Sequence, residues 1–351
     1  MNKMKLSACL IVKNEALMLE KTLPTLSQYA DEIILVDTGS SDETIAVAKK
    51  YGAKVSSFAW IDDFAAARNE SLKLATGDWI LWIDADEYLK EEDLETLKKA
   101  IAETKGKALS LSLYESALGL CETNNGYKRV KLFKNNCGFR FVRPINEQLV
   151  DAESKIVNGP GIPASIYHWG KNLEQERMTA KRKRYIKLYS AALEREPSDA
   201  HLHFLLAMNL EEEKMYAEAL LHYRKSYELA GNLEIARQAL EKKSSLLLRL
   251  KKIKEAASVA GKLMKIHSDS IQARTVYASI FLVTGKVDAA IEALTEALNI
   301  RNEASVNNCY QNVAMPNFLL GKAYQLKGEE ELAKACFAKA NEICPTLCGA
   351  N

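Results

Sequence analysis

The alternation of apolar and polar residues changes character near residue 170. Before that point, short apolar runs alternate with stretches of helical periodicity, and we interpret LSACLIV, EIILVD, AKVSSF and DWILWI as β-strands. Helices are predicted between these runs, from about Glu15, in SSDETIAVAKKYG and in DDFAAARNESLKLATG. This alternation predicts a largely parallel sheet covered by helices, whose ligands bind beyond the carboxyl ends of the strands.

Local signals set the expected ends of these helices. Ser41 is predicted to cap the second helix, and Thr44 stands where a capping box would carry glutamate. Glycine is a common residue just past a helix end, so the second helix is expected to stop at Gly52 and the third at Gly77.

From about residue 173 onward a helical repeat replaces the strand pattern. Three segments superimpose, each with a small residue in a first helix, an alanine twelve positions later and a large residue beyond it. The segments resemble the tetratricopeptide repeat, a helix–turn–helix unit of about 34 residues, and a weaker fourth copy centres on Ala256. The small residues are Ala207, Ala278 and Gly321, the alanines are Ala219, Ala290 and Ala333, and the large residues are Tyr223, Leu294 and Phe337.

The two patterns predict a division of the chain. We expect an α/β domain over residues 1–172, a linking helix over 173–197 and an all-α repeat domain over 198–351. A length of 351 residues agrees with more than one hydrophobic core.

Composition narrows the functional classes. The net charge of +2 gives no electrostatic case for nucleic acid, and no segment approaches the ~20 apolar residues of a membrane span. The seven cysteines form no CxxC pair, so neither a zinc site nor a disulfide framework is expected. A reducing cytoplasm is the expected location.

The apolar run WILWIDADEYL ends in the acids Asp84, Asp86 and Glu87. In an extended strand, residues two apart point to the same side, so Asp84 and Asp86 would repel each other unless a positive charge lay between them. Mg²⁺ or Mn²⁺, bridging to a phosphate, is the simplest candidate for that charge. The alternative for this cluster is a solvated turn.

The order of four segments carries a family resemblance. IVKNEA, ILVDTGSSDET, FAAARNESLKLATGDW and WIDADEYL follow one another as in family 2 glycosyltransferases of the GT-A fold, over residues 6–89. The resemblance implies that Asp37 contacts the base or ribose of a nucleotide, that Arg68 lies near the nucleotide or its diphosphate, and that Asp86 ligates a metal. The implied nucleotide-sugar-binding residues are Val12, Asn14, Glu15, Asp37, Arg68, Asp84, Ala85 and Asp86.

Two later segments belong to the same resemblance. RFVRPINEQLV carries Asn146 and Glu147 where this branch of the family often has His-Glu, and His168 in SIYHWG matches a histidine that completes the metal site in many GT-A enzymes. The implied metal ligands are therefore Asp84, Asp86 and His168. An imidazole beside carboxylates favours Mn²⁺ over Mg²⁺. We take Glu147 as the first candidate for the catalytic base and Glu87 as the second.

The resemblance implies a metal-dependent, inverting glycosyltransferase. We expect it to move a sugar from a nucleoside-diphosphate sugar, a UDP-sugar by preference, to a peptide or protein side chain, Cys or Ser, held by the repeats. It is similar in this to bacterial transferases that glycosylate bacteriocin peptides. The alternative is a glycan or lipid acceptor, with the repeats serving for homodimerisation or as a scaffold.

Two other classes compete with this interpretation. A sugar-phosphate nucleotidyltransferase should carry a Gly-rich basic loop after its first strand, and VKNEALML contains no glycine. A catalytically inactive scaffold would have no need of Asp84, Asp86 and His168.

Overall fold

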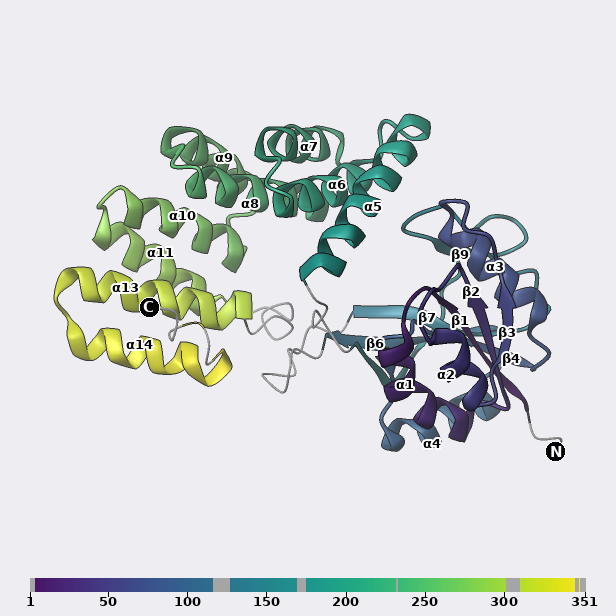
Figure 1. Cartoon of the computed structure of the whole chain (residues 1–351). Coiled ribbons are helices and arrows are strands. Elements are labelled where there is room, and N and C mark those ends of the chain that lie inside the picture. Colours follow the sequence, from purple (N-terminus) through teal and green to yellow (C-terminus); the bar gives the residue numbers. More distant parts are fainter. Residues whose placement is uncertain are drawn as a thin grey trace. The chain divides into compact units, whose positions relative to one another are not determined.

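The computed structural model of the chain describes residues 4–115, 127–168, 175–231, 233–300, 310–344 and 347. The chain divides into two compact units, Met1–Asn172 and Leu173–Asn351 (Figure 1). The predicted boundary at residues 172 and 173 falls outside the described residues.

An eight-stranded sheet forms the first unit. Its first four strands along the chain, β1 to β4, are mutually parallel, as the sequence predicts, and lie in the order β3-β2-β1-β4. The sheet continues as β7-β6-β10-β5, where β7 is antiparallel to both of its neighbours and β5 is antiparallel to β10. The strands are β1 (Leu6–Val12), β2 (Glu32–Asp37), β3 (Lys54–Ser57), β4 (Trp79–Trp82), β5 (Glu87–Tyr88), β6 (Ala108–Glu115), β7 (Tyr127–Lys134) and β10 (Gly161–His168), with β8 (Arg140–Val142) and β9 (Gln148–Val150) in a separate hairpin.

Helices cover both faces of this sheet (Figure 1). Alternate residues along a strand point to opposite faces, so each strand contributes to two cores. One core packs against α1 (Ala16–Tyr29), α2 (Thr44–Lys50) and α4 (Glu91–Glu103), and the other packs against α3 (Phe64–Leu74) and the β8–β9 hairpin. Leu10, Leu35, Leu81, Leu23 and Leu97 belong to the first core, and Cys9, Ile34, Ile80, Ala65 and Phe141 belong to the second.

Two predicted helix ends differ in the structure. The helix α2 begins at Thr44 after Glu43, which makes no side-chain cap, and the backbone N–H of Ser41 instead donates to Asn14 Oδ1 at 2.7 Å. The helix α3 ends at Leu74, before Gly77. Gly77 serves a close approach of two chain segments, because a Cβ there would lie 2.6 Å from Ser7 Oγ.

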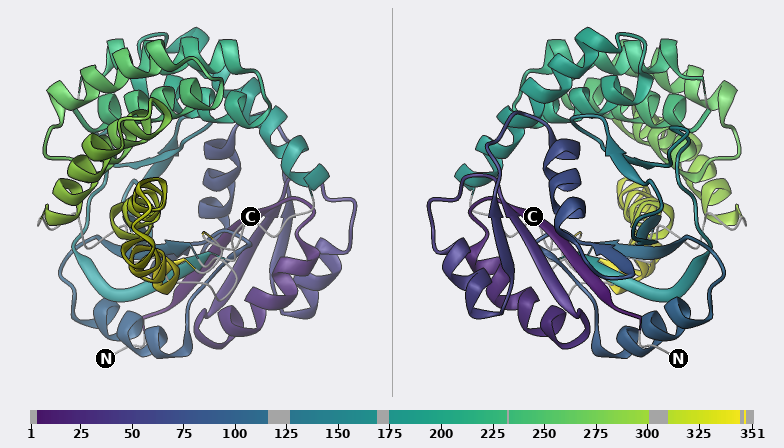
Figure 2. Two further views of the ribbon diagram at one scale, coloured as in Figure 1. Left: turned by 90° about the vertical axis from the view of Figure 1, so that its left-hand side faces the viewer. Right: turned by 90° about the vertical axis from the view of Figure 1, so that its right-hand side faces the viewer.

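The second unit is all helix in its described residues. It contains α5 (Gln175–Arg195), α6 (Ala200–Glu212), α7 (Tyr216–Leu229), α8 (Leu233–Arg249), α9 (Ile253–Ile266), α10 (Ile271–Val283), α11 (Val287–Asn299), the π-helix Tyr310–Ala314, α13 (Met315–Lys327) and α14 (Glu330–Ile343). Successive helices pair as hairpins that stack along the unit (Figures 1 and 2). Ala207 and Tyr223 are fully buried, and a Cβ at Gly321 would meet the ring of Phe337 at 2.7 Å, as the repeat pattern requires.

A histidine pair joins α6 to α7. The Nε2 atom of His203 lies 3.1 Å from the carbonyl oxygen of Pro197, so Nε2 carries the proton and donates it. Its Nδ1 therefore accepts from Nδ1 of His222, at 2.8 Å. Desolvation, assisted by the neighbouring His203, lowers the pKa of His222 to about 4, and desolvation also lowers the pKa of His203.

No helix in the part of the chain that the structure describes is long and apolar enough to cross a bilayer.

Candidate active site

The loops after β1 and β2 bring four predicted nucleotide-binding residues together. Val12 and Asp37 are partners in the register of the two strands. The buried carboxylate of Asp37 accepts from the backbone N–H groups of Gly39 and Ser40, both at 3.1 Å, and so orders the turn that follows β2.

Asn14 and Glu15 tie the first of these loops to the second. The residue Asn14 has a left-handed backbone, with φ of 56°, which asparagine tolerates better than most residues. Its backbone N–H donates to Ser40 Oγ at 2.8 Å, and the N–H of Glu15 donates to Thr44 Oγ1 at 2.8 Å. The structure thus places all four residues at the carboxyl edge of neighbouring parallel strands.

The acids after β4 lie on a turn and not on a strand. The strand ends at Trp82, and Ala85 and Asp86 form a turn before β5. The expectation that Asp84 and Asp86 share one side of an extended strand is therefore wrong. Asp84 Oδ1 lies 2.8 Å from Arg68 Nη2, whereas Asp86 Oδ2 lies 3.0 Å from His168 Nε2.

Arg68 is the centre of the first of these contacts. It comes from α3, is 6% exposed, and bridges Asp84 to Glu147, whose Oε1 lies 2.6 Å from Arg68 Nε. The guanidinium also lies 4.3 Å from the ring centroid of Trp82. Desolvation opposes ionisation of Asp84, but the charges of Arg68 and Lys131 outweigh it and hold the pKa of this carboxyl well below its usual range.

Glu147, the first candidate base, is therefore ion-paired, with a side chain that is 11% exposed. The preceding Asn146 has φ of 54°, and asparagine is among the residues most often found in this conformation. Arg129 also contacts this segment, since its Nη2 donates to the carbonyl oxygen of Glu147 at 3.2 Å.

Glu87, the second candidate base, is not placed to accept a proton from a substrate. It is 4% exposed, and its two oxygens lie 2.9 and 2.6 Å from Nζ of Lys131, which is fully buried. Glu87 is thus a buried, paired carboxylate, and this arrangement argues against a role as the base. Desolvation lowers the pKa of Lys131, while the charge of Glu87 opposes that shift.

The predicted residue Ala85 is a member of the hydrophobic core, and its carbonyl accepts from Thr22 Oγ1 at 3.1 Å. Its side chain therefore does not face a ligand. Its backbone fixes the turn against α1.

Sequence reasoning missed the cations that surround Trp82. Besides Arg68, two cations from β7 lie over the ring of Trp82: Lys131 Nζ is 3.6 Å and Arg129 Cζ is 4.6 Å from the ring centroid. The one available signal was a lysine inside the apolar run Val130–Phe133, an unusual residue for the interior of a sheet. These cations supply part of the positive charge that the acidic cluster requires.

Asp86 and His168 fit a divalent ion in part. They place one carboxylate and one imidazole side by side, with side chains 25% and 36% exposed, and the hydrogen bond to Asp86 raises the pKa of His168. A divalent ion at a diphosphate often takes one or two protein ligands and completes its coordination with phosphate oxygens and water. Among the described residues, no group of three or more Asp, Glu, His or Cys side chains is arranged to hold a metal, and Asp84 faces Arg68.

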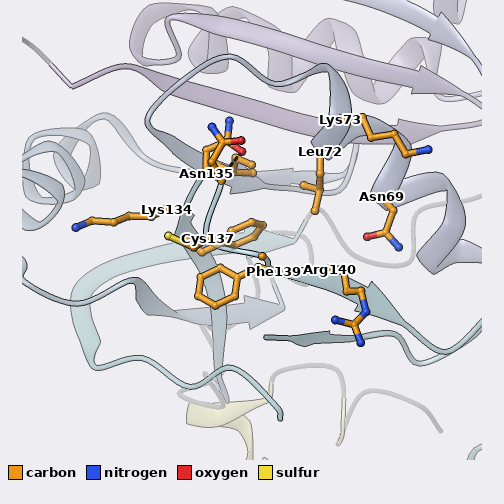
Figure 3. A pocket seen from close by; sticks show the side chains of 12 residues that line it. Asn69, Leu72, Lys73, Lys134, Asn135, Cys137, Phe139 and Arg140 are labelled. Atoms are coloured by element: carbon orange, nitrogen blue, oxygen red, sulfur yellow. Dashed lines mark hydrogen bonds between the residues drawn. The ribbon is translucent and has the colours of Figure 1, made fainter. Parts of the chain in front are cut away.

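A pocket of about 420 Å³ lies away from these residues. It is lined by α3, β4 and the segment joining β7 to β8, including Ile80, Phe133 and Phe139 (Figure 3). Its lysines, Lys73 and Lys134, point their amino groups in opposite directions in Figure 3. None of the acids of the candidate site lines it.

Comparison with known proteins identifies two families along the chain. Residues 7–139 match the model of glycosyl transferase family 2, and residues 316–347 match that of a tetratricopeptide repeat. The first unit carries a family 2 glycosyltransferase domain. Its largely parallel sheet is of the GT-A type.

The chain is similar to three known proteins. A TPR repeat-containing protein of Synechococcus elongatus is 35% identical over 208 residues, which is 56% of this chain and 50% of that protein. The glycosyltransferase SunS of Bacillus subtilis is 25% identical over 220 residues, 62% of this chain and 52% of SunS. This chain thus spans about half the length of both relatives. The solved structure of residues 1–349 of S. aureus TarS, in complex with UDP-GlcNAc, has 17% identity and a TM-score of 0.39, covering 84% of this chain and 90% of TarS.

Proposed function

We propose that this protein is a glycosyltransferase that moves a sugar from a nucleoside-diphosphate sugar to a peptide or protein side chain. The observation that carries the proposal is the convergence of Asp37, Arg68 and Asp84 on the carboxyl edge of β1, β2 and β4 in a domain of family 2. This edge is where parallel α/β sheets bind nucleotides. A UDP-sugar is the donor we expect. One of the similar proteins, SunS, is named a glycosyltransferase.

Different residues of the site would bind the nucleoside and the diphosphate of the donor. Asp37 and the loop held by Asn14 would bind the nucleoside, while Arg68 provides a fixed positive charge beside Asp84. A divalent ion, Mn²⁺ or Mg²⁺, would be held by Asp86 and His168, and would neutralise charge on the departing diphosphate. Electrostatic stabilisation of the leaving group and alignment of the acceptor are the main contributions that such a site makes.

The reaction we propose inverts the anomeric carbon by direct displacement, so the acceptor must lose a proton. Glu147 is the candidate base that remains, and it must leave Arg68 to act. A thiol has an ordinary pKa of about 8.5 and depends on a base far less than a hydroxyl does. The pairing of both candidate carboxylates therefore favours a cysteine acceptor over serine.

The repeats provide the expected acceptor surface. Stacked helix hairpins build extended surfaces that commonly bind peptides. Remote binding accelerates transfer only where it holds the acceptor residue in line with the sugar. Dimerisation through the repeats, with a glycan or lipid acceptor, is the alternative.

The first experiment measures donor binding. Thermal shift of the full chain with a panel of nucleotides and nucleotide sugars, each with and without Mn²⁺, should reveal the donor, because a ligand at 100 times its dissociation constant adds about 2.7 kcal/mol. A flat panel, in which no nucleotide or nucleotide sugar stabilises the protein, would contradict the proposal.

The second experiment identifies the acceptor. The chain is incubated with the preferred nucleotide sugar and with peptides that differ only by Cys or Ser at one position, and mass spectrometry records the added sugar. We expect transfer to Cys to exceed transfer to Ser. An accepting peptide with Cys replaced by Ala should still bind and inhibit; transfer to free sugars or lipids alone would favour the alternative.

A further inference from the structure

The turn of residues 84–87, which we call the acidic turn, carries candidate ligands although it belongs to no strand until Glu87. A turn that presents carboxylates must be fixed by bonds from outside itself or across itself. Its contacts therefore decide where Asp84 and Asp86 point.

Glu87 closes the acidic turn from both ends. Its side-chain Oε2 accepts from the backbone N–H of Asp84 at 2.9 Å, and its own N–H donates to the carbonyl oxygen of Asp84 at 3.0 Å. From the other side, Thr22 Oγ1 lies 3.1 Å from the carbonyl oxygen of Ala85 and also 3.1 Å from that of Met18 in α1, so its one proton is shared between the acidic turn and the helix. The turn is thus held by one side chain of its own and one side chain of α1.

Lys131 fixes Glu87 in turn. The residue comes from β7, which neighbours β4 in the sheet, and its Nζ contacts both Glu87 oxygens from a fully buried position. Burying an ion pair gains little stability over an apolar pair of the same volume, because both charges lose their hydration. A buried pair at this place is therefore poorly explained as a stabilising feature of the core.

Glu87 also sets the second half of the site. In the pairing of β5 with β10, Glu87 lies opposite His168, and this register brings the preceding Asp86 within 3.0 Å of the imidazole. The side chain of Glu87 thus holds the backbone of Asp84, while its backbone belongs to the strand pairing that brings Asp86 to His168.

We propose that Glu87 is a positioning residue that holds the acidic turn for the donor and its metal, and that Lys131 holds Glu87 in that role. The inference rests on the proposed function. It assigns Glu87 a task different from proton transfer, since Glu87 acts through Asp84 and Asp86.

Two double variants test the proposal. Both remove the buried charges: Lys131→Met with Glu87→Gln, and Lys131→Met with Glu87→Leu. Gln keeps an oxygen that can accept from the N–H of Asp84, whereas Leu does not. Outer partners of metal ligands typically matter by 10- to 100-fold in affinity or activity. We therefore expect the Leu variant to lose about 10- to 100-fold in nucleotide-sugar hydrolysis and to need more Mn²⁺ for half-saturation, while the Gln variant stays within about threefold of the parent.

The measurements are hydrolysis of the preferred nucleotide sugar, the half-saturating Mn²⁺ concentration and the melting temperature. Equal activity of the two double variants, whether high or low, overturns the proposal. The side-chain oxygen at position 87 that accepts from the N–H of Asp84 would then not matter for activity. A control, Arg237→Met with Glu241→Leu, removes a paired Arg and Glu within α8, 2.6 Å apart, and also the contact of Arg237 with the more exposed Glu234; it should leave hydrolysis unchanged.

A second pair of variants applies where the Leu variant does not fold. Thr22→Val removes the donor to Ala85 at constant volume, and Thr22→Ser keeps it. The Val variant should raise the Mn²⁺ requirement and the Ser variant should not; no difference between them contradicts the proposal. A parent protein that hydrolyses no nucleotide sugar and binds no UDP refutes the proposed function itself, which is a separate outcome.

Discussion

Removal of Arg68 should unfold the first unit at a markedly lower temperature. The guanidinium lies between two carboxylates, Asp84 at 2.8 Å and Glu147 at 2.6 Å, and rests on Trp82. The substitution Arg68→Met keeps most of the aliphatic packing and deletes the charge. The two carboxylates then keep their negative charges without their shared cation.

The magnitude follows from the exposure of the two partners. Breaking a buried pair from one side costs about 3–5 kcal/mol. Glu147 is 11% exposed and should bear most of that cost, whereas the side chain of Asp84 is 36% exposed and water can replace much of what it loses. We therefore take the lower value, about 3 kcal/mol. For a unit of this size, about 2–4 °C per kcal/mol gives a fall in melting temperature of about 6–12 °C.

Scanning calorimetry of the full chain is the assay, because the transition of the repeat unit serves as an internal reference. The double variant Arg68→Met/Glu147→Gln should recover at least half of the loss, since it removes the stranded charge. A fall below about 2 °C for Arg68→Met, or a double variant less stable than the single one, would refute the reasoning.

Three shorter predictions follow from other contacts. His168→Ala should raise the half-saturating Mn²⁺ concentration for sugar transfer about 10- to 100-fold with little change in melting temperature; an unchanged Mn²⁺ requirement with a lower melting temperature would make this histidine structural. The pKa of His222 is about 4 in the folded chain, below its unfolded value, so the unfolded state binds more protons and stability is lost as the pH falls toward 4. Between pH 7 and 5, urea unfolding of the second unit should show a loss of about 1 kcal/mol in the free energy of unfolding, after allowance for the partial exposure of His222. The variant His222→Asn should not show this loss. An equal loss in the parent and in the variant would contradict the prediction. Gly77→Ala places a Cβ within 2.9 Å of Ser7 and Lys5 atoms and should cost about 1–3 kcal/mol in denaturant unfolding, whereas Gly106→Ala, with its nearest contact at 3.3 Å, should cost far less.

Periodicity predicted the parallel half of the sheet because three of its strands, β1, β2 and β4, are buried on both faces. Runs such as EIILVD carry few polar residues, and the structure pairs them in parallel register. The helix ends were predicted less well. Ser41 fits a capping box by residue type, but its backbone N–H is already bound to Asn14 from another loop, and the helix begins at Thr44. A cap motif read from neighbouring residues cannot show the contact of Ser41 with Asn14, which is distant in the sequence.

The repeats were predictable for a different reason. Each small–large pair lies within one hairpin, so the contact and the sequence pattern have the same short range. Ser244 and Ala256 show this for the weak fourth copy: both are fully buried, and Ser244 Oγ donates to the carbonyl oxygen of Ala256 at 3.2 Å. Serine replaces the small residue there, and the spacing of twelve positions is kept.

The acidic cluster shows where sequence reasoning stopped. The acids were visible because they interrupt an apolar run, but the charges that compensate them come from elsewhere in the chain. Lys131 is 44 positions from Glu87 and meets it only because β7 lies beside β4. Neither the spacing of charges nor the periodicity within a single segment shows which strands become neighbours in the sheet.

The charges at the site explain why a cation is still expected there. Four carboxylates, Asp84, Asp86, Glu87 and Glu147, face three permanent cations, Arg68, Arg129 and Lys131, so one negative charge remains before His168 is counted. The protein's own side chains thus neutralise most of the repulsion between the acids. The negative charge that remains would repel a diphosphate, which is itself anionic. A divalent ion at Asp86 and His168 would reverse the sign of the net charge, so we expect tight donor binding to require the metal.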